Sequence, residues 1–315
     1  MTPTRRQLLT LAAATTLAGP APAARAASAT PRLPAQKSLQ LFGATLRYHE
    51  LGRPGAGKPT LVLLHGLGSS AAGDWGQVMP QLARTHHVLA PDQLGFGQSD
   101  KPFIQYGIQT WVDFLGEFLR EKRVADGFQL MGESLGGWIA AQYTLQALRG
   151  EAAGESFTLR KPGRLVLADA AGFREVMAAQ FEKPAPGKGG AGPSLAGQKA
   201  LLARIFRAPA FNTEAAIRNG LGWSISKGDS FTIAAVHANP AILNEAIDGQ
   251  LAGITIPTLV VWGQHDELIP LALGERYARE IPGARLVVVP EAGHAPMIET
   301  PAAFLAALGD FLTRP

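Results

Sequence analysis

Short apolar runs alternate with longer amphipathic stretches along most of this chain, and that alternation limits the folds it can adopt. Six of the runs have the composition of strands buried on both faces: TLVLLH, HHVLAP, FQLMG, RLVLAD, TLVVWG and RLVVVP. Such strands are typical of parallel sheets, which helices cover on both sides. The stretches between them, such as residues 109–122, have helical periodicity. The pattern predicts an α/β fold with a mostly parallel central sheet and helices on both faces.

Two segments depart from this alternation. SLQLF and TLRYHEL flank Gly43 and predict a hairpin ahead of the parallel strands. Residues 173–251, which follow the sixth predicted strand, RLVLAD, show helical patterning but no convincing strand. We interpret 173–251 as a helical cap, or lid, inserted into a core built from residues 27–172 and 252–315.

The N-terminus has the features of an export signal. Arg5 and Arg6 precede an alanine-rich apolar run, and small residues then lead to Ala24-Arg25-Ala26, a typical cleavage pattern. The paired arginines, followed by two leucines, resemble the twin-arginine type of signal. We therefore expect residues 1–26 to engage the twin-arginine export machinery and to be cleaved. The mature protein would then be periplasmic or secreted.

Composition excludes several classes of function. The chain has 29 Lys and Arg against 25 Asp and Glu, but the signal contains three arginines and no acid, which leaves 26 basic residues against 25 acidic ones. A nearly neutral domain gives no reason to expect nucleic-acid binding. No apolar stretch is long enough for a membrane span. The absence of cysteine excludes disulfides, thiolate metal sites and a cysteine nucleophile.

Ser134 lies in the sequence GESLGG, between the predicted strand FQLMG and a predicted helix that begins at Leu135. A serine with glycines two positions away on each side, at a tight strand-to-helix turn, is the arrangement of a nucleophile elbow. Serine is also a favoured residue at the start of a helix, so the motif alone is weak. Its context favours a nucleophile.

Partners for Ser134 follow two later strands. Asp266 comes after TLVVWGQH and His294 after RLVVVPEAG, so both lie just past the carboxyl ends of predicted strands. A serine hydroxyl needs a histidine to accept its proton and a carboxylate to orient the imidazole. Asp169, at the end of RLVLAD, is a rival for the carboxylate role, but we favour Asp266.

Two backbone N–H groups complete the predicted site. Leu67, in the glycine-containing loop LLHGLGSS, and Leu135, directly after the nucleophile, would donate hydrogen bonds to the oxyanion of a tetrahedral intermediate. No pair of histidines has the spacing of a metal site. We expect neither a metal nor a cofactor to take part.

The motifs HGLG, PDQLGFGQSDKP, GESLGG, GQHDELIP and GHAPMIETP occur in this order and together resemble the α/β-hydrolase superfamily over residues 38–314. They are most similar to its lid-bearing branch, which contains esterases, cofactor-free haloperoxidase-like enzymes and carbon–carbon bond hydrolases of ring-cleavage products. The resemblance implies the same roles for Ser134, Asp266, His294, Leu67 and Leu135. Epoxide hydrolases and haloalkane dehalogenases share the scaffold but have aspartate at the nucleophile position, which argues against both.

From these observations we expect an exported serine hydrolase that cleaves a small carboxylic ester through an acyl-enzyme. One alternative keeps the triad and hydrolyses the carbon–carbon bond of ring-cleavage-type diketones. Such substrates usually carry a carboxylate that a basic residue of the cap binds, and the candidates are Arg174, Arg204, Arg207 and Arg218. An alternative of a different class is a non-catalytic ligand-binding homologue on the same fold.

Overall fold

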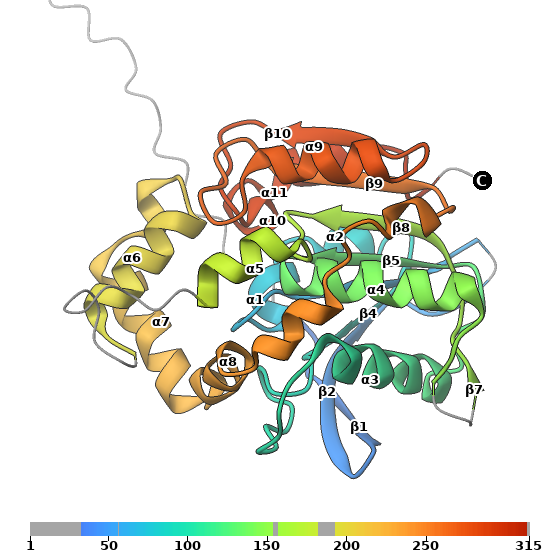
Figure 1. The fold of residues 1–315 in the computed structure, drawn as a ribbon, viewed down its shortest axis with the longest axis horizontal. Coiled ribbons are helices and arrows are strands. Elements are labelled where there is room, and N and C mark those ends of the chain that lie inside the picture. Colours follow the sequence, from blue (N-terminus) through green and yellow to red (C-terminus); the bar gives the residue numbers. More distant parts are fainter. Residues whose placement is uncertain (1–32, 56, 154–156, 182–192, 314–315) are drawn as a thin grey trace, which may run out of the picture. The chain divides into compact units, whose positions relative to one another are not determined.

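The computed structural model describes residues 33–55, 57–153, 157–181 and 193–313, so the predicted export signal lies outside the described residues. At its centre is an eight-stranded sheet in the order β1-β2-β4-β3-β5-β8-β9-β10 (Figure 1). The strands of this sheet are β1 Lys37–Leu41, β2 Ala44–Leu51, β3 Thr60–Leu64, β4 His87–Pro91, β5 Phe128–Glu133, β8 Pro162–Ala168, β9 Thr258–Gly263 and β10 Arg285–Val289. A separate short hairpin pairs β6 Ala152–Ala153 with β7 Phe157–Thr158.

The strand directions confirm the predicted α/β-hydrolase fold with a mostly parallel sheet. Strand β2 pairs antiparallel with β1 and β4, while every pair from β4 to β10 is parallel. The predicted hairpin is β1–β2, and its two turn residues, Phe42 and Gly43, have φ of 50° and 83°. Positive φ at both turn residues matches the right-handed twist of the flanking strands.

Helices cover both faces of the sheet, as expected for a parallel arrangement. They are α1 Ala71–Trp75, α2 Met79–Leu82, α3 Ile108–Glu121, α4 Leu135–Arg149, α9 Leu271–Glu280, α10 Pro296–Glu299 and α11 Pro301–Leu308. The core accordingly has two parts. Leu130 of β5 faces one part together with Trp111, while the next residue, Met131, faces the other together with Phe304. Successive side chains of a strand point to opposite faces, so each central strand contributes to both parts.

Two expectations from the sequence differ from the structure in detail. The run that became β10 is not buried on both faces, since Val288 is 38 % exposed. It is an edge strand, which has a neighbour on one side only. The amphipathic stretch of residues 75–84 also predicts one continuous helix, but α1 ends at Trp75 and α2 spans only Met79–Leu82, with Pro80 in its first turn. Proline lacks the N–H that a continuous helix would need there, so a new helix begins.

The segment between β8 and β9, residues 173–251, is called the insertion below. Its described elements are α5 Arg174–Phe181, α6 Leu195–Ile205, η1 Pro209–Phe211, α7 Glu214–Ser226, α8 Asp229–His237, η2 Pro240–Glu245 and η3 Leu251–Gly253. Helices α6, α7 and α8 lie beside the sheet, to the left in Figure 1. Thr232 Oγ1 of α8 donates a 2.7 Å hydrogen bond to the carbonyl of Gly95, in the loop that follows β4. Within the described ranges, no helix combines the length and hydropathy that crossing a bilayer requires.

Candidate active site

Ser134 lies between β5 and α4 in a strained backbone conformation. Its φ is 51° and its ψ is −116°, a combination that L-residues rarely adopt. Backbone hydrogen bonds hold it there: its N–H donates to the Ala168 carbonyl at 3.0 Å, and its carbonyl accepts from the Ala171 N–H at 2.9 Å. Strained residues of this kind persist only where the surrounding structure fixes them, and they cluster at functional sites.

The glycines that flank Ser134 allow three backbone segments to pack closely. A Cβ at Gly132 would lie 2.1 Å from the carbonyl oxygen of Gly136, and a Cβ at Gly136 would lie 2.3 Å from that of Leu64. No side chain can be added at either position unless β3, β5 or α4 moves apart. Glycine suits the sharp bend at Ser134, and at these two positions it also permits the close packing of the backbone.

Asp266 and His294 meet across the ends of β9 and β10. The Nδ1 of His294 lies 2.7 Å from Oδ2 of Asp266, and both residues are buried. The other carboxylate oxygen of Asp266 accepts hydrogen bonds from the backbone N–H groups of Leu268 and Ile269, both at 2.8 Å. A carboxylate oriented in this way places the proton of a neutral imidazole on Nδ1. The Nε2 atom of His294 then carries the lone pair that a base needs.

The Nε2 atom of His294 faces Glu133 in this structure. It lies 3.3 Å from Oε1 of Glu133, whereas Ser134 Oγ makes no hydrogen bond within the described part of the chain. The structure thus brings Asp266 and His294 into contact and places Ser134 next in sequence to the acid that faces Nε2. Sequence reasoning missed Glu133. A charged residue at the end of the apolar strand FQLMGE is the signal that could have found it.

The loop after β3 carries Leu67, the first predicted oxyanion donor. Gly66 N–H donates a 2.8 Å hydrogen bond to Asp74 Oδ2, which fixes the loop, and Gly68 has a φ of +74°. The N–H of Leu67 has no acceptor among the described residues. Leu135 is the first residue of α4, so its N–H lacks an intrahelical acceptor as well. Both groups therefore have free donors, and their role as an oxyanion hole stays a prediction.

Asp169, the rival acid, lies deep in the same cluster. Its Oδ1 accepts a 2.7 Å hydrogen bond from Gly263 N–H, while its buried Oδ2 has no hydrogen-bond partner. Burial, and next the negative charge of Asp266, raises the pKa of Asp169 well above its usual range. Since His294 Nδ1 bonds to Asp266, the geometry favours Asp266 as the acid.

The cluster of Asp169, Asp266 and His294 also has the residue types of a metal site. Oxygen or nitrogen atoms of Asp169, Asp266 and His294 lie within 4.8 Å of one another. However, the Nδ1 atom of His294 and the Oδ2 atom of Asp266 are joined by their own hydrogen bond. A metal ion bound at these two atoms would have to displace the proton between them. The arrangement fits a hydrogen-bonded Asp–His pair better than a metal centre.

The four arginines considered for a substrate carboxylate are all exposed. Arg204 donates to the Glu267 carbonyl at 3.4 Å, Arg207 to Glu291 at 3.1 Å and Arg218 to Glu214 at 2.8 Å. For Arg174, the backbone N–H donates a hydrogen bond to Asp248, and no hydrogen bond of its side chain is described. None of the four is a buried cation near Ser134.

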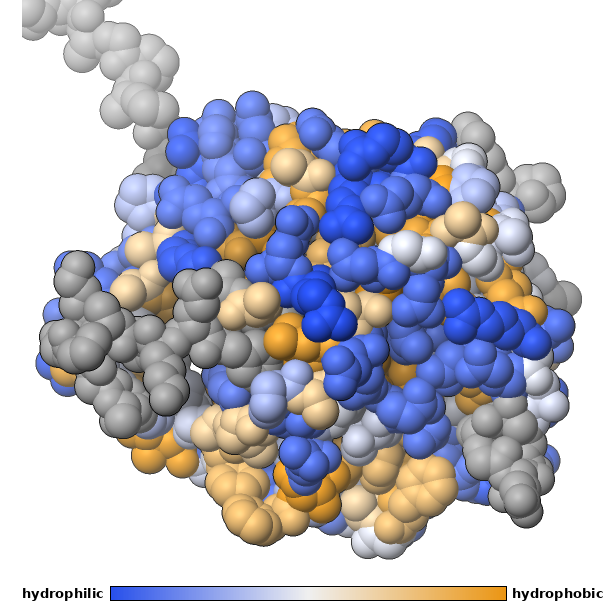
Figure 2. Space-filling model, in the orientation of Figure 1, coloured by the Kyte–Doolittle hydropathy of each residue, from blue (hydrophilic) through white to orange (hydrophobic). Residues whose placement is uncertain are grey.

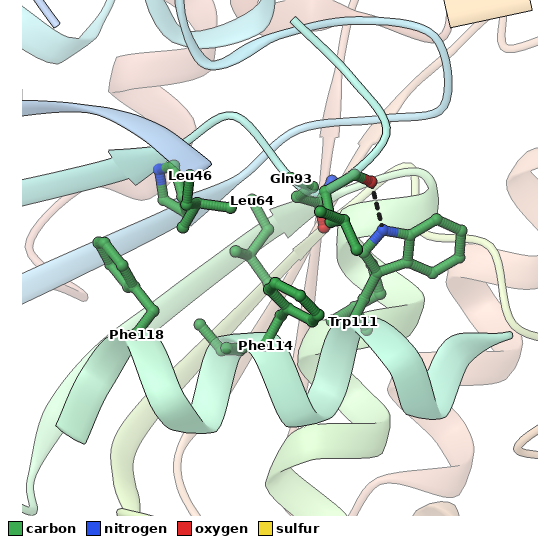
Figure 3. Close-up of a pocket in the computed structure, with 10 residues that line it drawn as sticks. Leu46, Leu64, Gln93, Trp111, Phe114 and Phe118 are labelled. Carbon is green, nitrogen blue, oxygen red and sulfur yellow. Dashed lines mark hydrogen bonds between the residues drawn. The ribbon is translucent and has the colours of Figure 1, made fainter. Parts of the chain in front are cut away.

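A small cavity lies between α3 and the sheet (Figure 3). Gln93 and Trp111 are among its lining residues, and the indole N–H of Trp111 donates to the Leu94 carbonyl at 2.9 Å. Its volume of about 20 Å³ has room for roughly one water molecule. A larger cavity, about 680 Å³, is lined by residues such as Lys58, Arg84 and Gln129. Ser134 lines neither cavity.

Apolar side chains gather along one edge of the surface, at the bottom of Figure 2, below α8 and around the β1–β2 hairpin. Phe103, in the loop before α3, is 88 % exposed, and its ring centroid lies 5.1 Å from that of Phe231 in α8. The core and the insertion therefore meet through aromatic contact at this edge.

Known proteins resemble this chain over most of its length. Residues 61–308 match the sequence profile described as the alpha/beta hydrolase family. The chain is 32 % identical to 2-hydroxymuconate semialdehyde hydrolase of Pseudomonas sp. (strain CF600), over 82 % of this chain and 88 % of that protein. It is 30 % identical to pimeloyl-[acyl-carrier protein] methyl ester esterase of Aeromonas hydrophila, over 81 % and 95 %. Among solved structures, a meta-cleavage product hydrolase from Pseudomonas fluorescens IP01 matches with a TM-score of 0.69 and 25 % identity, covering 86 % of this chain and 96 % of that one.

Proposed function

This chain belongs to the alpha/beta hydrolase family, and we propose that it is a lid-bearing serine hydrolase that cleaves the carbon–carbon bond beside a ketone in ring-cleavage-type substrates. The observation that carries the substrate class is the 32 % identity to 2-hydroxymuconate semialdehyde hydrolase over most of both chains. The hydrogen-bonded Asp266–His294 pair beside the Ser134 elbow supports the serine chemistry. This proposal replaces the ester substrate expected from the sequence.

The reaction would use the site as follows. His294 Nε2 accepts the Ser134 hydroxyl proton as Oγ attacks the ketone carbon, and the resulting oxyanion accepts hydrogen bonds from the N–H groups of Leu67 and Leu135. When the carbon–carbon bond breaks, its electron pair passes to the carbon leaving group, where a conjugated carbonyl delocalises it. His294 returns the proton to that carbon. A water molecule, deprotonated by His294, then hydrolyses the acyl-enzyme and releases Ser134.

The insertion is proposed to act as the lid, with residues 173–251 as its bounds. Its contacts with the active-site loops support this role, because a Cβ at Gly68 would lie 2.9 Å from Ile233 Cδ1 of α8. An apolar side chain thus rests against the loop that carries the Leu67 donor. A cover of this kind would exclude water from the tetrahedral intermediate.

Hydrolysis of carboxylic esters is the second candidate. The exposed positions of Arg174, Arg204, Arg207 and Arg218 favour it, because a ring-cleavage product carries a carboxylate and these arginines do not form a buried receptor for one. The 30 % identity to a methyl ester esterase supports the same substrate class. Both candidates use the same triad and differ only in the leaving group.

Steady-state kinetics would separate the candidates. For the purified mature protein, we expect kcat/KM for a 2-hydroxy-6-oxo-2,4-dienoate, followed by loss of its absorbance, to exceed that for p-nitrophenyl acetate by on the order of 100-fold. Ser134→Ala should abolish both activities. Faster turnover of the ester would favour the second candidate. If neither is turned over and Ser134→Ala binds the dienoate as tightly as wild type, the protein is a non-catalytic binding homologue.

Export through the twin-arginine machinery is proposed from Arg5, Arg6 and the Ala24-Arg25-Ala26 sequence. Expression of the full chain in a bacterium should yield periplasmic or secreted protein that begins near Ala27. Replacing both Arg5 and Arg6 by lysine should leave uncleaved protein inside the cell, since a twin-arginine signal depends on the arginine pair. Unchanged export of that variant would instead indicate an ordinary secretory signal.

A further inference from the structure

The end of helix α6, in the insertion, contacts the loop that carries the proposed catalytic base. The backbone N–H of His294 donates a 2.7 Å hydrogen bond to the carbonyl of Ile205, the last residue of α6. The residue before the base, Gly293, lies so close that a Cβ there would be 2.3 Å from the same carbonyl oxygen. The last carbonyls of a helix have no donor within it, and this one takes its donor from the backbone of the base. The main chain of His294 is therefore in direct contact with the insertion.

Glu299, at the end of α10, joins the same two segments through its side chain. Its Oε2 accepts a 2.7 Å hydrogen bond from Gly293 N–H, and its Oε1 accepts a hydrogen bond from Ala208 N–H. The residue is partly buried, and hydrogen bonds to a carboxylate are stronger than those between neutral groups. One carboxylate thus holds the residue before His294 and a residue of the insertion at the same time. This pair of hydrogen bonds is called the Glu299 bridge below.

The second hydrogen bond of the Glu299 bridge is the one that a local role does not explain. A carboxylate bonded only to Gly293 would be part of the turn, because the two residues are 6 positions apart. The bond to Ala208 spans 91 positions, and the turn does not need it. A further side-chain contact between these segments, Arg207 with Glu291 at 3.1 Å, is exposed and should contribute little. The Glu299 bridge is therefore the stronger side-chain connection between the insertion and the histidine loop.

We propose that Glu299 is a positioning residue that makes the alignment of His294 depend on the insertion, a role that rests on the serine chemistry proposed above. When residues 205–208 are in place, the carboxylate fixes the Gly293 peptide and with it the backbone of the base. His294 Nδ1 then lies 2.7 Å from Asp266 Oδ2. When residues 205–208 move away, the base loses both of its connections to the insertion. The substrate therefore meets an aligned base only beneath the insertion, where water is excluded.

Two variants break the Glu299 bridge from opposite sides. Glu299→Gln keeps the size of the side chain but presents an NH₂ group to one of the two N–H donors, so one hydrogen bond is lost. Ala208→Pro removes the donor in the insertion, and proline suits this position because Ala208 has a φ of −72°. Misplacing a catalytic group by about 1 Å can cost on the order of 100-fold, so each variant should lower kcat by roughly 10- to 100-fold and change KM by less than about threefold. Since both variants remove one interaction, the double variant should lose little more than either alone.

Glu245→Gln is the matched control. Glu245 also joins the insertion to the core through a carboxylate, because its Oε2 accepts a 2.6 Å hydrogen bond from the N–H of Gln109 in α3. Among the described hydrogen bonds, neither residue reaches the loops that carry Asp266 and His294. We expect this variant to lower the melting temperature while kcat stays within about twofold of wild type.

Two measurements on the purified protein test the inference. The first is steady-state kinetics with the faster of the two candidate substrates, at a temperature where melting curves show every variant folded. The second is the low-field ¹H NMR signal of the proton between His294 and Asp266, assigned by its loss in His294→Gln. This signal reports the alignment of the pair without requiring turnover. We expect it to shift or broaden in Glu299→Gln and Ala208→Pro but not in Glu245→Gln.

Three results would overturn the inference. In the first, kcat and the NMR signal of both bridge variants match those of wild type. In the second, KM rises without a loss in kcat, which would make Glu299 only a structural anchor of the insertion. In the third, the losses of the two variants add fully in the double variant. If wild type turns over neither substrate but the NMR signal shifts as expected, the proposed function fails and the Glu299 bridge stands.

Discussion

Asp266 lies 2.7 Å from His294 through Oδ2, and its second oxygen is fully occupied by two backbone N–H groups at 2.8 Å. The neighbouring Asp169 has no bond to the imidazole and keeps one oxygen without a hydrogen-bond partner. The two acids lie side by side, yet only one is oriented to hold the base. This asymmetry leads to the first prediction.

Asp266→Asn should lower kcat/KM by on the order of 10⁴, because an asparagine amide stabilises the wrong imidazole tautomer. Asp169→Asn is the matched control. Its amide oxygen can still accept from Gly263 N–H, so we expect a loss below about tenfold. Rates with the preferred substrate and thermal melts of both variants provide the comparison. An equal loss in Asp169→Asn with an unchanged melting temperature would make Asp169 the acid.

Gly136→Ala should destabilise the fold by roughly 1–3 kcal/mol or more, since the new Cβ would lie 2.3 Å from the Leu64 carbonyl oxygen. Gly222→Ala in α7 is the control, because its Cβ would meet nothing within 4 Å. Alanine is favoured over glycine inside a helix, so this variant should be neutral or up to about 1 kcal/mol more stable. Urea unfolding monitored by circular dichroism measures both. Equal stability of the two variants would contradict the close packing.

Glu50 should make stability depend on acid pH. Burial alone raises its pKa, but hydrogen bonds from Lys37, His87 and Lys122 outweigh burial and lower it from 4.5 to about 2. A lowered carboxyl pKa stabilises the folded state above the unfolded value and loses that contribution as pH falls through the folded value. Glu50→Gln should therefore be less stable than wild type at pH 7, and the difference should shrink between pH 4.5 and pH 2. A difference that is constant over that range would refute the linkage.

Lys101 connects the core to the insertion through Asp229. Its Nζ donates to the Gly97 carbonyl at 2.8 Å and lies 3.4 Å from Oδ1 of Asp229, which is 1 % exposed. Lys101→Met would leave that carboxylate buried without its cation, at a cost of about 3 kcal/mol. Lys227→Met, which removes a cation above Trp223, should cost less than about 1 kcal/mol. Guanidinium unfolding compares the two variants, and similar losses would show that the ion pair is unimportant.

The strands were predictable because each apolar run, by its own composition and length, indicates a buried strand. FQLMG and TLVVWG became β5 and β9, whose residues are buried throughout. The same composition could not reveal that the last strand lies at the edge of the sheet. Edge position depends on which strands pair, and pairing is a long-range property.

For the site, the sequence predicts which residues lie at the strand ends but not which atoms they contact. Parallel strands carry their functional groups at their carboxyl ends, and this rule placed Asp266 and His294 in one region. It could not show that Nε2 faces Glu133 or that the four arginines point to solvent. Those facts depend on side-chain rotamers and on contacts between distant segments, which motif spacing does not encode.

The positive φ of Ser134 implies a conflict between stability and activity at one residue. A non-glycine residue in such a conformation costs of order 1–3 kcal/mol, so Ser134→Gly should unfold at a higher temperature than wild type while losing the nucleophile. If stability were the only requirement, glycine would therefore be the better residue at this position. The nucleophilic role proposed for Ser134 would account for a serine at this position despite its cost in stability.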